Sequence, residues 1–511
     1  MQYILSAAQM RATDKYVIEN CGIAGLVLME NAARTVTDYI SKDINSDDKV
    51  VIFCGKGNNG GDGLAVARLL ANNCRVKVVM TSLSADLSPD ANVNFEMLPN
   101  NVDVVDEISD RELDKAILVV DAMLGTGAAG VLHGKILEYS RQINRVRNGK
   151  GVTAIDLPTG VNADTGEIVE DAIFAQATLT LACAKPGIFL YPGAGYCGKV
   201  IVCDIGFPEN VIEDENCCGK IYESADIKKI LPYRTDDAHK SSVGWVMVIA
   251  GSQGMTGAAV MSATAACRAG AGLVKLAMPA SLVQIVNATN PAMVCLPMPE
   301  HKCGGLSYRA TEKLQPEMRT VRAALIGPGM SRQPATANAI RKIVETSQLP
   351  LVIDADAITA IAGYAGMVSD RKFPTIITPH PGEMSRLLNV DVETLQKDRI
   401  GYALQAAKMY NATVVFKGTP AVIASPDGQI VLNVIGSPTL AVAGSGDMLA
   451  GIITGLAGQG LSAFDAAVAG CYIGSMAARN ISAQMGSIGV ITTDIISSIP
   501  SAIKSIAESE K

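Results

Sequence analysis

Residues 49–80 read KVVIFCGKGNNGGDGLAVARLLANNCRVKVVM, and this stretch decides the fold of the first half of the chain. An apolar run of strand length is followed by a glycine-rich segment, a helical stretch and a second apolar run. A strand, a turn, a helix and a strand in this order form a βαβ unit with parallel strands. The same alternation continues along the chain, so we expect an α/β protein built on mostly parallel sheets.

The glycines of this stretch have the spacing Gly55-x-Gly57-x-x-Gly60, which matches the dinucleotide fingerprint. The fingerprint also needs an acidic residue about 20 positions further on, to hold a ribose hydroxyl. Position 80 is Met80, and the nearest acidic residue beyond it is Asp86. A redox dehydrogenase is therefore disfavoured. A Walker loop is excluded because no Gly-Lys-Ser/Thr follows.

The segment 58–63, NNGGDG, places two amides and a carboxylate at the start of the predicted helix. Free N–H groups there suit phosphate, and amide oxygens suit a hard cation. The structural alternative is a tight turn in which glycine and asparagine adopt left-handed conformations.

Asp121 and Asp156 each stand where a later apolar run ends, in DAMLGTG (121–127) and DLPTG (156–160). Ligands of open α/β sheets bind beyond the carboxyl ends of the strands, so these side chains and Asn59 are expected in one crevice. Each aspartate could instead serve only as a helix N-cap.

The second half carries short motifs after successive apolar runs, of which GSGD at 444–447 is the most informative. A Gly-Ser-Gly turn at a helix N-terminus forms an anion hole, and Asp447 beside it can accept a proton from an attacking hydroxyl. Phosphoryl transfer needs these two features. The alternatives are a simple N-cap turn at 444–447, a structural role for His380 and a strand-end cation at Lys417.

Composition sets the outer limits. The 511 residues are 49% hydrophobic and 18% charged, which excludes a disordered chain. The net charge of −7 shows no basic field for nucleic acid. It divides into −11 for residues 1–218 and +4 for residues 219–511, which indicates two units with a linker between about 208 and 222, near the acidic cluster Glu213, Asp214 and Glu215. Many small residues and few aromatic ones indicate helices packed closely on sheets.

The twelve cysteines include no CxxC pair, which is typical of buried thiols in a reducing compartment. The first 20 residues lack the basic segment and apolar core of a secretory signal, so we expect a cytoplasmic protein. Residues 241–267 are uncharged, but their glycines predict a strand, a turn and a helix rather than a membrane span.

The motifs GNNGGDG (57–63), DAMLGTG (121–127) and DLPTG (156–160) resemble those of the NAD(P)H-hydrate epimerase family. The resemblance implies a Rossmann-like domain that interconverts the R and S hydrates of NADH or NADPH, with Asp156 as a catalytic base. It implies a potassium ion held by Asn59, Asp121 and Thr159, the last a residue where serine is common in the family. The hydrated nucleotide would contact Asn58, Asn59, Gly60, Gly61, Asp62, Gly125, Thr126, Gly127, Ala128, Ala129, Gly130, Val131 and Asp156.

The second half resembles the ribokinase-like NAD(P)H-hydrate dehydratases in GSQGMTGAA (251–259), GPGM (327–330), DADA (354–357), TPHPGE (378–383), KGT (417–419) and AGSGDMLAG (443–451). The resemblance implies phosphorylation of the hydrate hydroxyl followed by loss of phosphate, with Asp447 as the base. The hydrate would contact Ala258, Gly329, His380 and Asp447. The nucleotide would contact Lys417, Gly418, Thr419, Pro420, Ala421, Gly444, Ser445 and Gly446.

We therefore expect a three-layer αβα Rossmann-like domain over residues 1–217 and a ribokinase-like α/β domain over residues 218–511. The fusion resembles bifunctional repair enzymes of prokaryotes, which implies ADP as co-substrate and Mg²⁺ for its phosphates, with Glu383 as the one candidate ligand. A homo-oligomer is expected, with no nucleic-acid or membrane partner. The rival hypotheses are a ribokinase-class kinase for a small alcohol and a non-catalytic sensor of damaged nucleotides.

Overall fold

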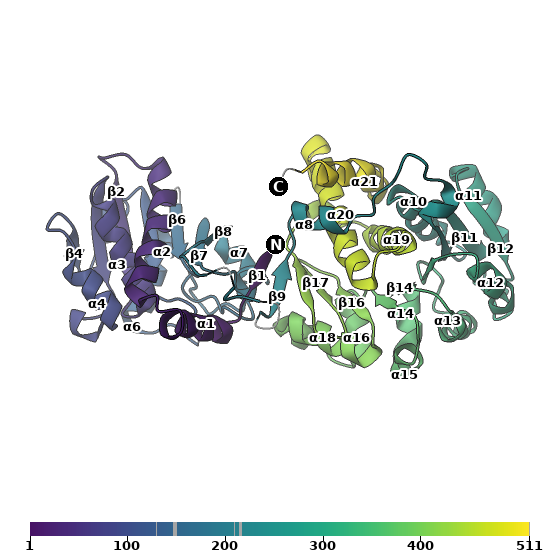
Figure 1. Ribbon diagram of the computed structural model, residues 1–511, viewed down its shortest axis with the longest axis horizontal. Helices are drawn as coiled ribbons and strands as arrows, with labels where there is room; N and C mark the ends of the chain where they lie inside the picture. The colour runs from purple at the N-terminus through teal and green to yellow at the C-terminus, as the bar shows by residue number, and fades with distance from the viewer. Residues whose placement is uncertain (129, 147–150, 209, 214–216, 510–511) are drawn as a thin grey trace. The chain divides into compact units, whose positions relative to one another are not determined.

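The structure is a computed structural model that describes residues 1–128, 130–146, 151–208, 210–213 and 217–509. The chain divides into two compact units, an N-terminal unit (Gln2–Lys220) and a C-terminal unit (Ile221–Lys511, with Met1). Asp214 and Glu215 of the acidic cluster expected at the linker lie outside the described residues. Figure 1 shows the helices and strands of both units.

The N-terminal unit is built on a parallel sheet with the strand order β4-β3-β2-β5-β6-β7-β8. The strands of this sheet are β2 (Lys49–Cys54), β3 (Arg75–Met80), β4 (Asp103–Val105), β5 (Leu118–Ala122), β6 (Gly151–Ile155), β7 (Ala177–Leu181) and β8 (Lys199–Cys203). The unit also contains the short strand β1 (Gln2–Ile4), which lies outside this sheet. Its helices are α1 (Ala7–Glu19), α2 (Gly25–Ile40), α3 (Asn58–Leu70), α4 (Pro89–Glu96), α5 (Asp110–Leu113), α6 (Gly134–Val146) and α7 (Ala194–Cys197). Strand β9 (Gly219–Ile221) spans the division between the units.

Strand β2 shows why this sheet is covered on both faces. Val50 and Ile52 pack into one apolar cluster with residues of α2 and α3, whereas Val51 and Phe53 pack into another with residues of α6. Successive side chains of a strand point to opposite faces, so a continuous apolar run such as KVVIFC fits only a sheet buried between two helical layers. The predicted three-layer αβα arrangement of this unit is confirmed.

The C-terminal unit holds a second mostly parallel sheet, with the order β18-β17-β16-β15-β14-β13-β10-β11-β12. These strands are β10 (Trp245–Ile249), β11 (Leu273–Pro279), β12 (Val294–Met298), β13 (Ala323–Ile326), β14 (Leu351–Ile353), β15 (Thr375–Ile377), β16 (Thr413–Phe416), β17 (Ala421–Ala424) and β18 (Ile430–Asn433). Strand β17 runs antiparallel to both β16 and β18, and the other neighbours from β16 to β12 are parallel.

The helices of the C-terminal unit include two long apolar ones, α19 and α20. In chain order they are α8 (Ser224–Ile230), α9 (Lys240–Val243), α10 (Thr256–Arg268), α11 (Val283–Thr289), α12 (Ala310–Met318), α13 (Pro334–Thr346), α14 (Asp356–Ile361), α15 (Ala365–Ser369), α16 (Pro381–Leu388), α17 (Val392–Lys397), α18 (Arg399–Tyr410), α19 (Ser445–Gly458), α20 (Ala463–Met485) and α21 (Thr492–Ala507).

Small residues set the distance between α10 and α19. A Cβ atom at Gly451 would overlap the carbonyl oxygen of Ser262, and one at Gly455 would press on the carbonyl oxygen of Ala266. Close packing of this kind needs glycine, because any side chain would push the two backbones apart. Part of the glycine excess therefore serves helix packing rather than ligand loops, as the many small residues predicted.

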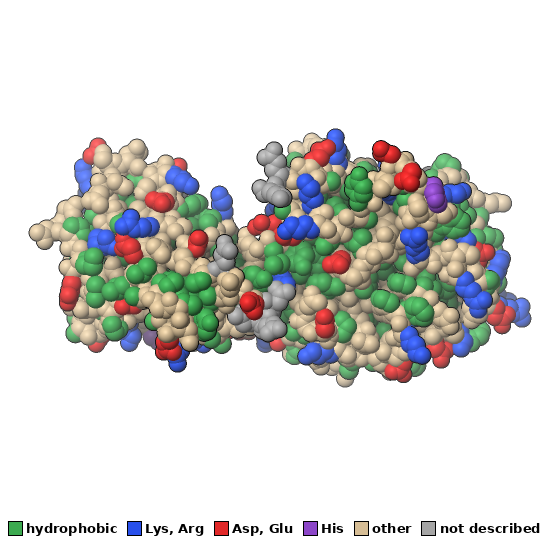
Figure 2. All heavy atoms as spheres, in the orientation of Figure 1, with side chains coloured by type: hydrophobic (Ala, Val, Ile, Leu, Met, Phe, Trp, Pro, Cys, Tyr) green, Lys and Arg blue, Asp and Glu red, His purple; other side chains and the backbone are tan. Residues whose placement is uncertain are grey.

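The uncharged run 241–267 holds most of the short helix α9, then β10, a glycine turn and all of α10 except Arg268, so the expected strand, turn and helix are present. Among the described residues, no helix combines the length and apolarity that crossing a membrane requires. On the face shown in Figure 2, acidic and basic side chains are interspersed rather than gathered into a basic stripe.

Candidate active sites

The N-terminal unit has its topological switch point between β2 and β5, where the strand order reverses. Helix α3 begins at Asn58, directly after the N-cap Gly57, so NNGGDG forms the first turns of the helix. None of its glycines has a positive φ, which contradicts the left-handed turn considered for this segment. A Cβ atom at Gly60 would overlap the carbonyl oxygen of Gly55, so this glycine permits close packing of the helix start on the strand end.

The three predicted metal ligands meet at this switch point. The backbone N–H and the Oγ1 of Thr159 donate to the Asp121 carboxylate at 2.7 and 2.8 Å. Leu124 connects this pair to Asn59, because its N–H donates to Thr159 Oγ1 (3.2 Å) and its carbonyl accepts from Asn59 Nδ2 (3.0 Å). Burial raises the pKa of Asp121 to about 6, against the hydrogen bonds from Thr159, which lower it.

Asn59 Oδ1 is buried and has no hydrogen-bond partner among the described residues. A buried amide oxygen without a hydrogen-bond partner lowers the stability of the fold by about 1–3 kcal/mol. An amide oxygen of this kind beside a buried carboxylate therefore indicates that a ligand binds there. The grouping of amide, carboxylate and hydroxyl oxygens is a donor set for a hard cation.

Asp156 follows β6 in a left-handed conformation, with φ of 66°. Its Oδ2 accepts from the N–H of Thr126 at 3.1 Å, and its Oδ1 lies 2.6 Å from Nζ of Lys185. Lys185 is 1% exposed and also donates to Thr180 Oγ1 and to the carbonyl of Leu181. The sequence analysis missed Lys185, whose only signal is a single cation in the uncharged segment that follows β7.

A cavity of about 830 Å³ opens at this edge of the sheet. Asp156 and Lys185 line it together with Asp14 of helix α1, another residue that the motifs did not indicate. The predicted substrate-binding residues that also line it are Asn58, Asn59, Asp62, Gly125, Thr126, Gly127 and Ala128.

A second cavity, of about 500 Å³, shares Gly125 and Ala128 with the first and is also lined by Gly130 and Val131. Gly60 and Gly61 are buried and are not among the described residues lining either cavity. Ala129 lies outside the described residues.

In the C-terminal unit, the strand order reverses between β10 and β13, and predicted site residues again follow the strands at this switch point. Gly251 and Gly329 follow these strands with φ of 87° and 59°, and Ser252 Oγ donates to the carbonyl of Gly329 at 2.8 Å. A Cβ atom at Gly329 would lie 2.9 Å from Cβ of Ala258 on α10. The two small residues predicted to contact the hydrate are therefore adjacent.

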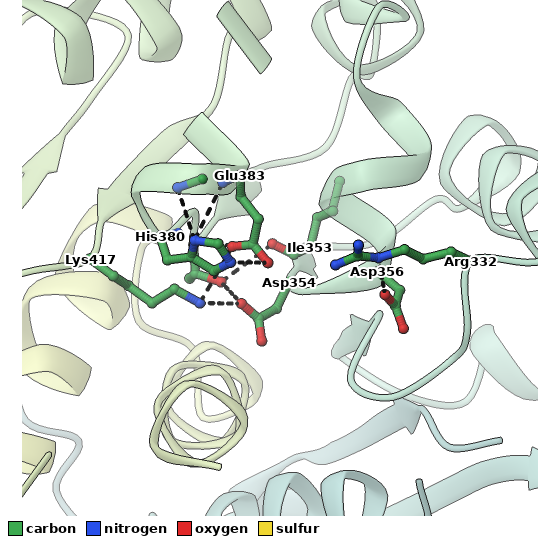
Figure 3. Close-up of polar contacts among 9 residues, drawn as sticks. Arg332, Ile353, Asp354, Asp356, His380, Glu383 and Lys417 are labelled. Atoms are coloured by element: carbon green, nitrogen blue, oxygen red, sulfur yellow. Dashed lines mark hydrogen bonds and ion pairs between the residues drawn. The ribbon is translucent and has the colours of Figure 1, made fainter. Parts of the chain in front are cut away.

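Beyond the next strands, charged side chains converge (Figure 3). Lys417 Nζ lies 2.8 Å from Oδ1 of Asp354, which is 1% exposed and also accepts from Thr378 Oγ1 at 2.6 Å. Lys417 Nζ lies 3.8 Å from Glu383 Oε2. Although burial opposes it, the charges of Asp354 and Glu383 raise the pKa of Lys417, so this side chain is a fixed cation.

His380 caps helix α16, and its Nδ1 accepts from the N–H groups of Gly382 (3.0 Å) and Glu383 (3.4 Å). Burial lowers the pKa of His380, and the charge of Lys417 adds to this effect, so the ring is neutral at pH 7 with its proton on Nε2. Half of its side chain is exposed, so it serves as a helix cap that still offers a donor. Burial raises the pKa of Glu383 to about 7.

Helix α19 brings the anion hole to the same place. Its N-cap Gly444 has φ of 91°, and Asp447 lies in its first turn. A Cβ atom at Gly446 would be 3.2 Å from Lys417 Nζ, so the ammonium stands at the helix N-terminus. Burial raises the pKa of Asp447 to about 7, with repulsion from Asp354 adding and Lys417 opposing.

The predicted nucleotide-binding residues 417–421 form the turn between the antiparallel strands β16 and β17 and the first residue of β17. Arg399, which the sequence analysis missed, donates from Nη2 to the carbonyls of Phe416, Lys417 and Pro420. A Cβ atom at Gly418 would lie 2.5 Å from this Nη2. Arg399 is 4% exposed and fixes the turn from behind.

Asp356, in the motif DADA, lies beyond the end of its strand. It begins helix α14, where its carboxylate accepts from the N–H of Ser331 (2.9 Å) and from Nε of Arg332 (3.2 Å). The two motifs GPGM and DADA are thereby joined at one edge, because the parallel strands β13 and β14 end side by side.

A helix N-terminus, a buried ammonium and a carboxylate of raised basicity can hold a phosphate and activate an attacking hydroxyl. Such a fold and site define an enzyme of the phosphoryl-transfer class, which here carries a second α/β unit with its own ligand cavity.

Comparison with known proteins identifies the family within this class. Residues 246–501 match the family model of NAD(P)H-hydrate dehydratase, and residues 25–187 match that of the YjeF-related protein N-terminus.

The chain belongs to the family of bifunctional NAD(P)H-hydrate repair enzymes. It is 36% identical to the bifunctional NAD(P)H-hydrate repair enzyme Nnr of Moorella thermoacetica, over 99% of this chain and 97% of that protein. It is 37% identical to the enzyme of the same name from Salinibacter ruber, over 97% of this chain and 95% of that protein.

A solved structure of a ribokinase-like superfamily protein from Enterococcus faecalis is 24% identical, with a TM-score of 0.50, and the match covers 59% of this chain and 100% of that one. The predicted family resemblance and the predicted fold class, a Rossmann-like unit followed by a ribokinase-like unit, are confirmed.

Proposed function

We propose that residues 1–217 interconvert the R and S hydrates of NADH and NADPH, and that residues 218–511 convert the S hydrate to NAD(P)H while ADP becomes AMP and phosphate. The observation that carries the dehydratase assignment is the meeting of Asp447, Lys417 and the N-terminus of α19. Both sites lie at switch points of their sheets, where α/β proteins bind nucleotides.

In the dehydratase step, Asp447 takes the proton of the hydrate hydroxyl while the oxygen attacks the terminal phosphorus of ADP. Lys417 and the N–H groups at Ser445 and Gly446 hold the charge of the transferred group. Phosphate then leaves with the electrons of the C–O bond, and loss of a proton from the adjacent ring carbon restores the double bond. Phosphate is a far better leaving group than hydroxide, which explains why a nucleotide is consumed.

Magnesium fits this site through the nucleotide more than through the protein. The described residues include no group of three His, Cys, Asp or Glu side chains suited to a metal ion. Both oxygens of Glu383 have partners, the N–H of His380 at 2.9 Å and its Nε2 at 3.4 Å, so the geometry does not favour Glu383 as a ligand. Mg²⁺ is commonly held by phosphates and one or two carboxylates, and it would supply charge neutralisation.

Potassium fits the oxygen set of Asn59, Asp121 and Thr159, because Asn59 Oδ1 is buried without a partner. A cation there supplies a fixed positive charge beside the cavity that Asp156 lines. We expect that replacing K⁺ by choline lowers the epimerisation rate at least about tenfold, which corresponds to about 1.4 kcal/mol. The rate is followed as the ratio of R to S hydrate, separated by chromatography, with no nucleotide present.

Thermal unfolding gives an independent measure of the same site. K⁺ should raise the melting temperature of the N-terminal unit, because a ligand that binds only the native state stabilises it. Asn59→Ala should remove this response, whereas Asn72→Ala, which changes an exposed asparagine bonded to the carbonyl of Leu69, should keep it. An equal response to K⁺ in both variants would refute the assignment.

The pH dependence of dehydration follows from Asp447. The base must be ionised, and burial raises its pKa to about 7, so the ionised fraction grows as pH rises through 7. We expect kcat, measured with saturating ADP and S hydrate, to fall about tenfold for each pH unit below 7. If kcat instead fell only near pH 4, as is typical of an exposed aspartate, this would contradict the role of Asp447 as the base.

The nucleotide donor is tested by comparing ADP with ATP at equal concentration, with the return of NADH absorbance as the readout. We expect a higher kcat/KM with ADP and one AMP released for each NADH formed. A phosphorylated hydrate that accumulates stably would favour the rival kinase, and tight hydrate binding without turnover would favour the sensor.

We also propose that the protein is a cytoplasmic homo-oligomer. Its twelve free cysteines support a reducing compartment.

A further inference from the structure

Four of the ionisable side chains that line the large cavity of the N-terminal unit act on one another electrostatically: Asp14, Asp62, Asp156 and Lys185. Asp14 belongs to α1 and Asp62 to α3, whereas Asp156 follows β6 and Lys185 follows β7. Within this group, three carboxyl groups face one ammonium. Three negative charges close to one another are costly in a partly buried site, so these carboxyl groups cannot all be ionised alike.

The ammonium of Lys185 forms an ion pair with the carboxylate of Asp156. The ammonium lies 2.6 Å from Oδ1, and its other contacts go to the neutral oxygens of Thr180 and Leu181. The second oxygen of Asp156 accepts from the N–H of Thr126. The contacts of the Asp156 carboxylate are therefore all with donors, the farthest being Thr180 Oγ1 and the N–H of Leu181 at 3.5 Å, and Oδ2 keeps a lone pair that can take a proton.

Asp62 has the opposite environment. It is 7% exposed, and within the described residues no donor reaches its carboxylate. Burial raises its pKa well above the usual value, and the charges of Asp156 and Asp14 add to this, against Lys185. Burial and these two charges therefore favour the protonated form of Asp62. Burial also raises the pKa of Asp14, to about 6, so Asp14 is mostly ionised at pH 7.

Asp62 and Asp156 face one region of the cavity. Asp62 lies one helical turn beyond Asn59, on the same face of α3. A Cβ atom at Gly125 would be 3.1 Å from Oδ2 of Asp156 and 3.2 Å from Cβ of Asn59, so the Asp156 carboxylate and this face of α3 flank the same glycine. A ligand lying at Gly125 has the carboxylate of Asp156 on one side and the carboxyl group of Asp62 one helical turn beyond Asn59.

The hydrate carries its hydroxyl on a ring carbon bonded to the ring nitrogen. Inverting that carbon through ring opening needs a base and an acid: the hydroxyl loses its proton as the C=O bond forms, and the C–N electrons go to nitrogen, which gains a proton. Rotation about the adjacent C–C bond and the reverse step close the ring on the other face. Acid and base exchange roles in the return, so no proton is lost or gained overall.

We propose that Asp62 is the catalytic acid that protonates the ring nitrogen, that Asp156 receives the hydroxyl proton, and that Lys185 is the positioning residue that holds and orients the Asp156 carboxylate. This assignment rests on the proposed epimerase function and names the second half of its proton transfer. Two carboxyl groups with environments of opposite effect divide the acid and base roles between them, as in other enzymes with such pairs.

The test uses the full chain, an R-enriched hydrate and no nucleotide, and measures the approach of the R to S ratio to equilibrium across pH 5–10. Asp62→Asn should lower the rate about 10²-fold or more and remove the alkaline limb of the profile, since an amide has no proton to lose. Asp14→Asn, the matched change at the same cavity, should cost less than about tenfold and move the alkaline limb to lower pH, because it removes a repelling carboxylate.

Lys185→Met should lower kcat with little change in KM, and Lys185→Arg, which keeps the charge, should restore most of the rate. The charged groups that face Asp62 are Asp14, Asp156 and Lys185; others around the cavity are Arg11, Lys56, Asp86, Asp90, His133 and Lys135. The melting curve reports whether each variant is folded, and ADP-dependent dehydration of the S hydrate, the activity proposed for the C-terminal unit, should stay at its wild-type rate.

Three results would overturn the proposal: Asp62→Asn with a rate within threefold of wild type, an alkaline limb that survives in Asp62→Asn, or a wild-type rate without any alkaline limb. The last measurement needs no variant, so a misfolded Asp62→Asn chain does not leave the question open. A wild-type chain that never accelerates the equilibration would instead refute the epimerase function itself, with no bearing on which residue is the acid.

Discussion

Asp447→Asn will abolish the nucleotide-dependent return of NADH from its hydrate while leaving the epimerisation rate unchanged. The substitution keeps the size of the side chain and removes its ability to accept a proton. A positioned general base contributes about 10²–10⁴ to a rate, so we expect a fall in kcat of this order. Stopped assays of NADH and phosphate with the purified full chain measure the first activity, and the R to S ratio measures the second.

The loss of dehydration in Asp447→Asn should not come from a loss of protein stability. Burial works against the ionised form of Asp447, and the substitution removes that charge from a site where Asp354 repels it. Asp447→Asn is therefore expected to melt no lower than wild type. Asp465→Asn is the matched control, because Asp465 also lies in the first turn of a helix, α20, which begins beyond the far end of α19. If Asp447→Asn retains more than about a tenth of the wild-type kcat, the base is another group.

The strand ends were the predictable part of both sites. Motifs after β2, β5 and β6, and after β10, β13, β14, β15 and β16, each stand at the carboxyl end of a parallel strand. An apolar run followed by glycine and a polar residue marks such an end locally, and the parallel sheet brings these ends to one edge. Recognising the runs was therefore enough to expect Asn59, Asp121 and Asp156 at one edge of the sheet, whereas Thr159 was indicated only by the family resemblance.

The parts that escaped prediction depend on partners distant in sequence. Lys185 pairs with Asp156, 29 residues away, and Arg399 holds a turn 17 to 21 residues further on. Neither lies in a glycine motif, so only the three-dimensional contact reveals it. For the glycines of NNGGDG, the alternative of a left-handed turn is wrong, and backbone clashes seen only after packing, such as Gly60 against Gly55, explain why glycine is required.

Asp156→Asn will leave dehydration of the S hydrate at its wild-type rate and slow epimerisation by about 10²–10⁴-fold. The combined reaction makes this visible without separating the epimers. With ADP and a mixture of both hydrates, the wild-type chain should convert all of it in one phase. The variant should convert only the share that begins as S, and then continue at the uncatalysed rate of epimerisation. The amplitude of the fast phase should equal the starting S fraction measured by chromatography.

The substitution also leaves Lys185 without its charged partner, and breaking a buried ion pair costs about 3–5 kcal/mol of unfolding free energy. A loss of epimerisation in Asp156→Asn alone could therefore reflect a weakened N-terminal unit. The double variant Asp156→Asn/Lys185→Met separates the two causes, because removing both charges relieves the uncompensated ammonium. If Asp156 supplies the base, the double variant should recover the melting temperature and remain inactive. If it recovers epimerisation together with stability, Asp156 holds the fold and another group moves the proton.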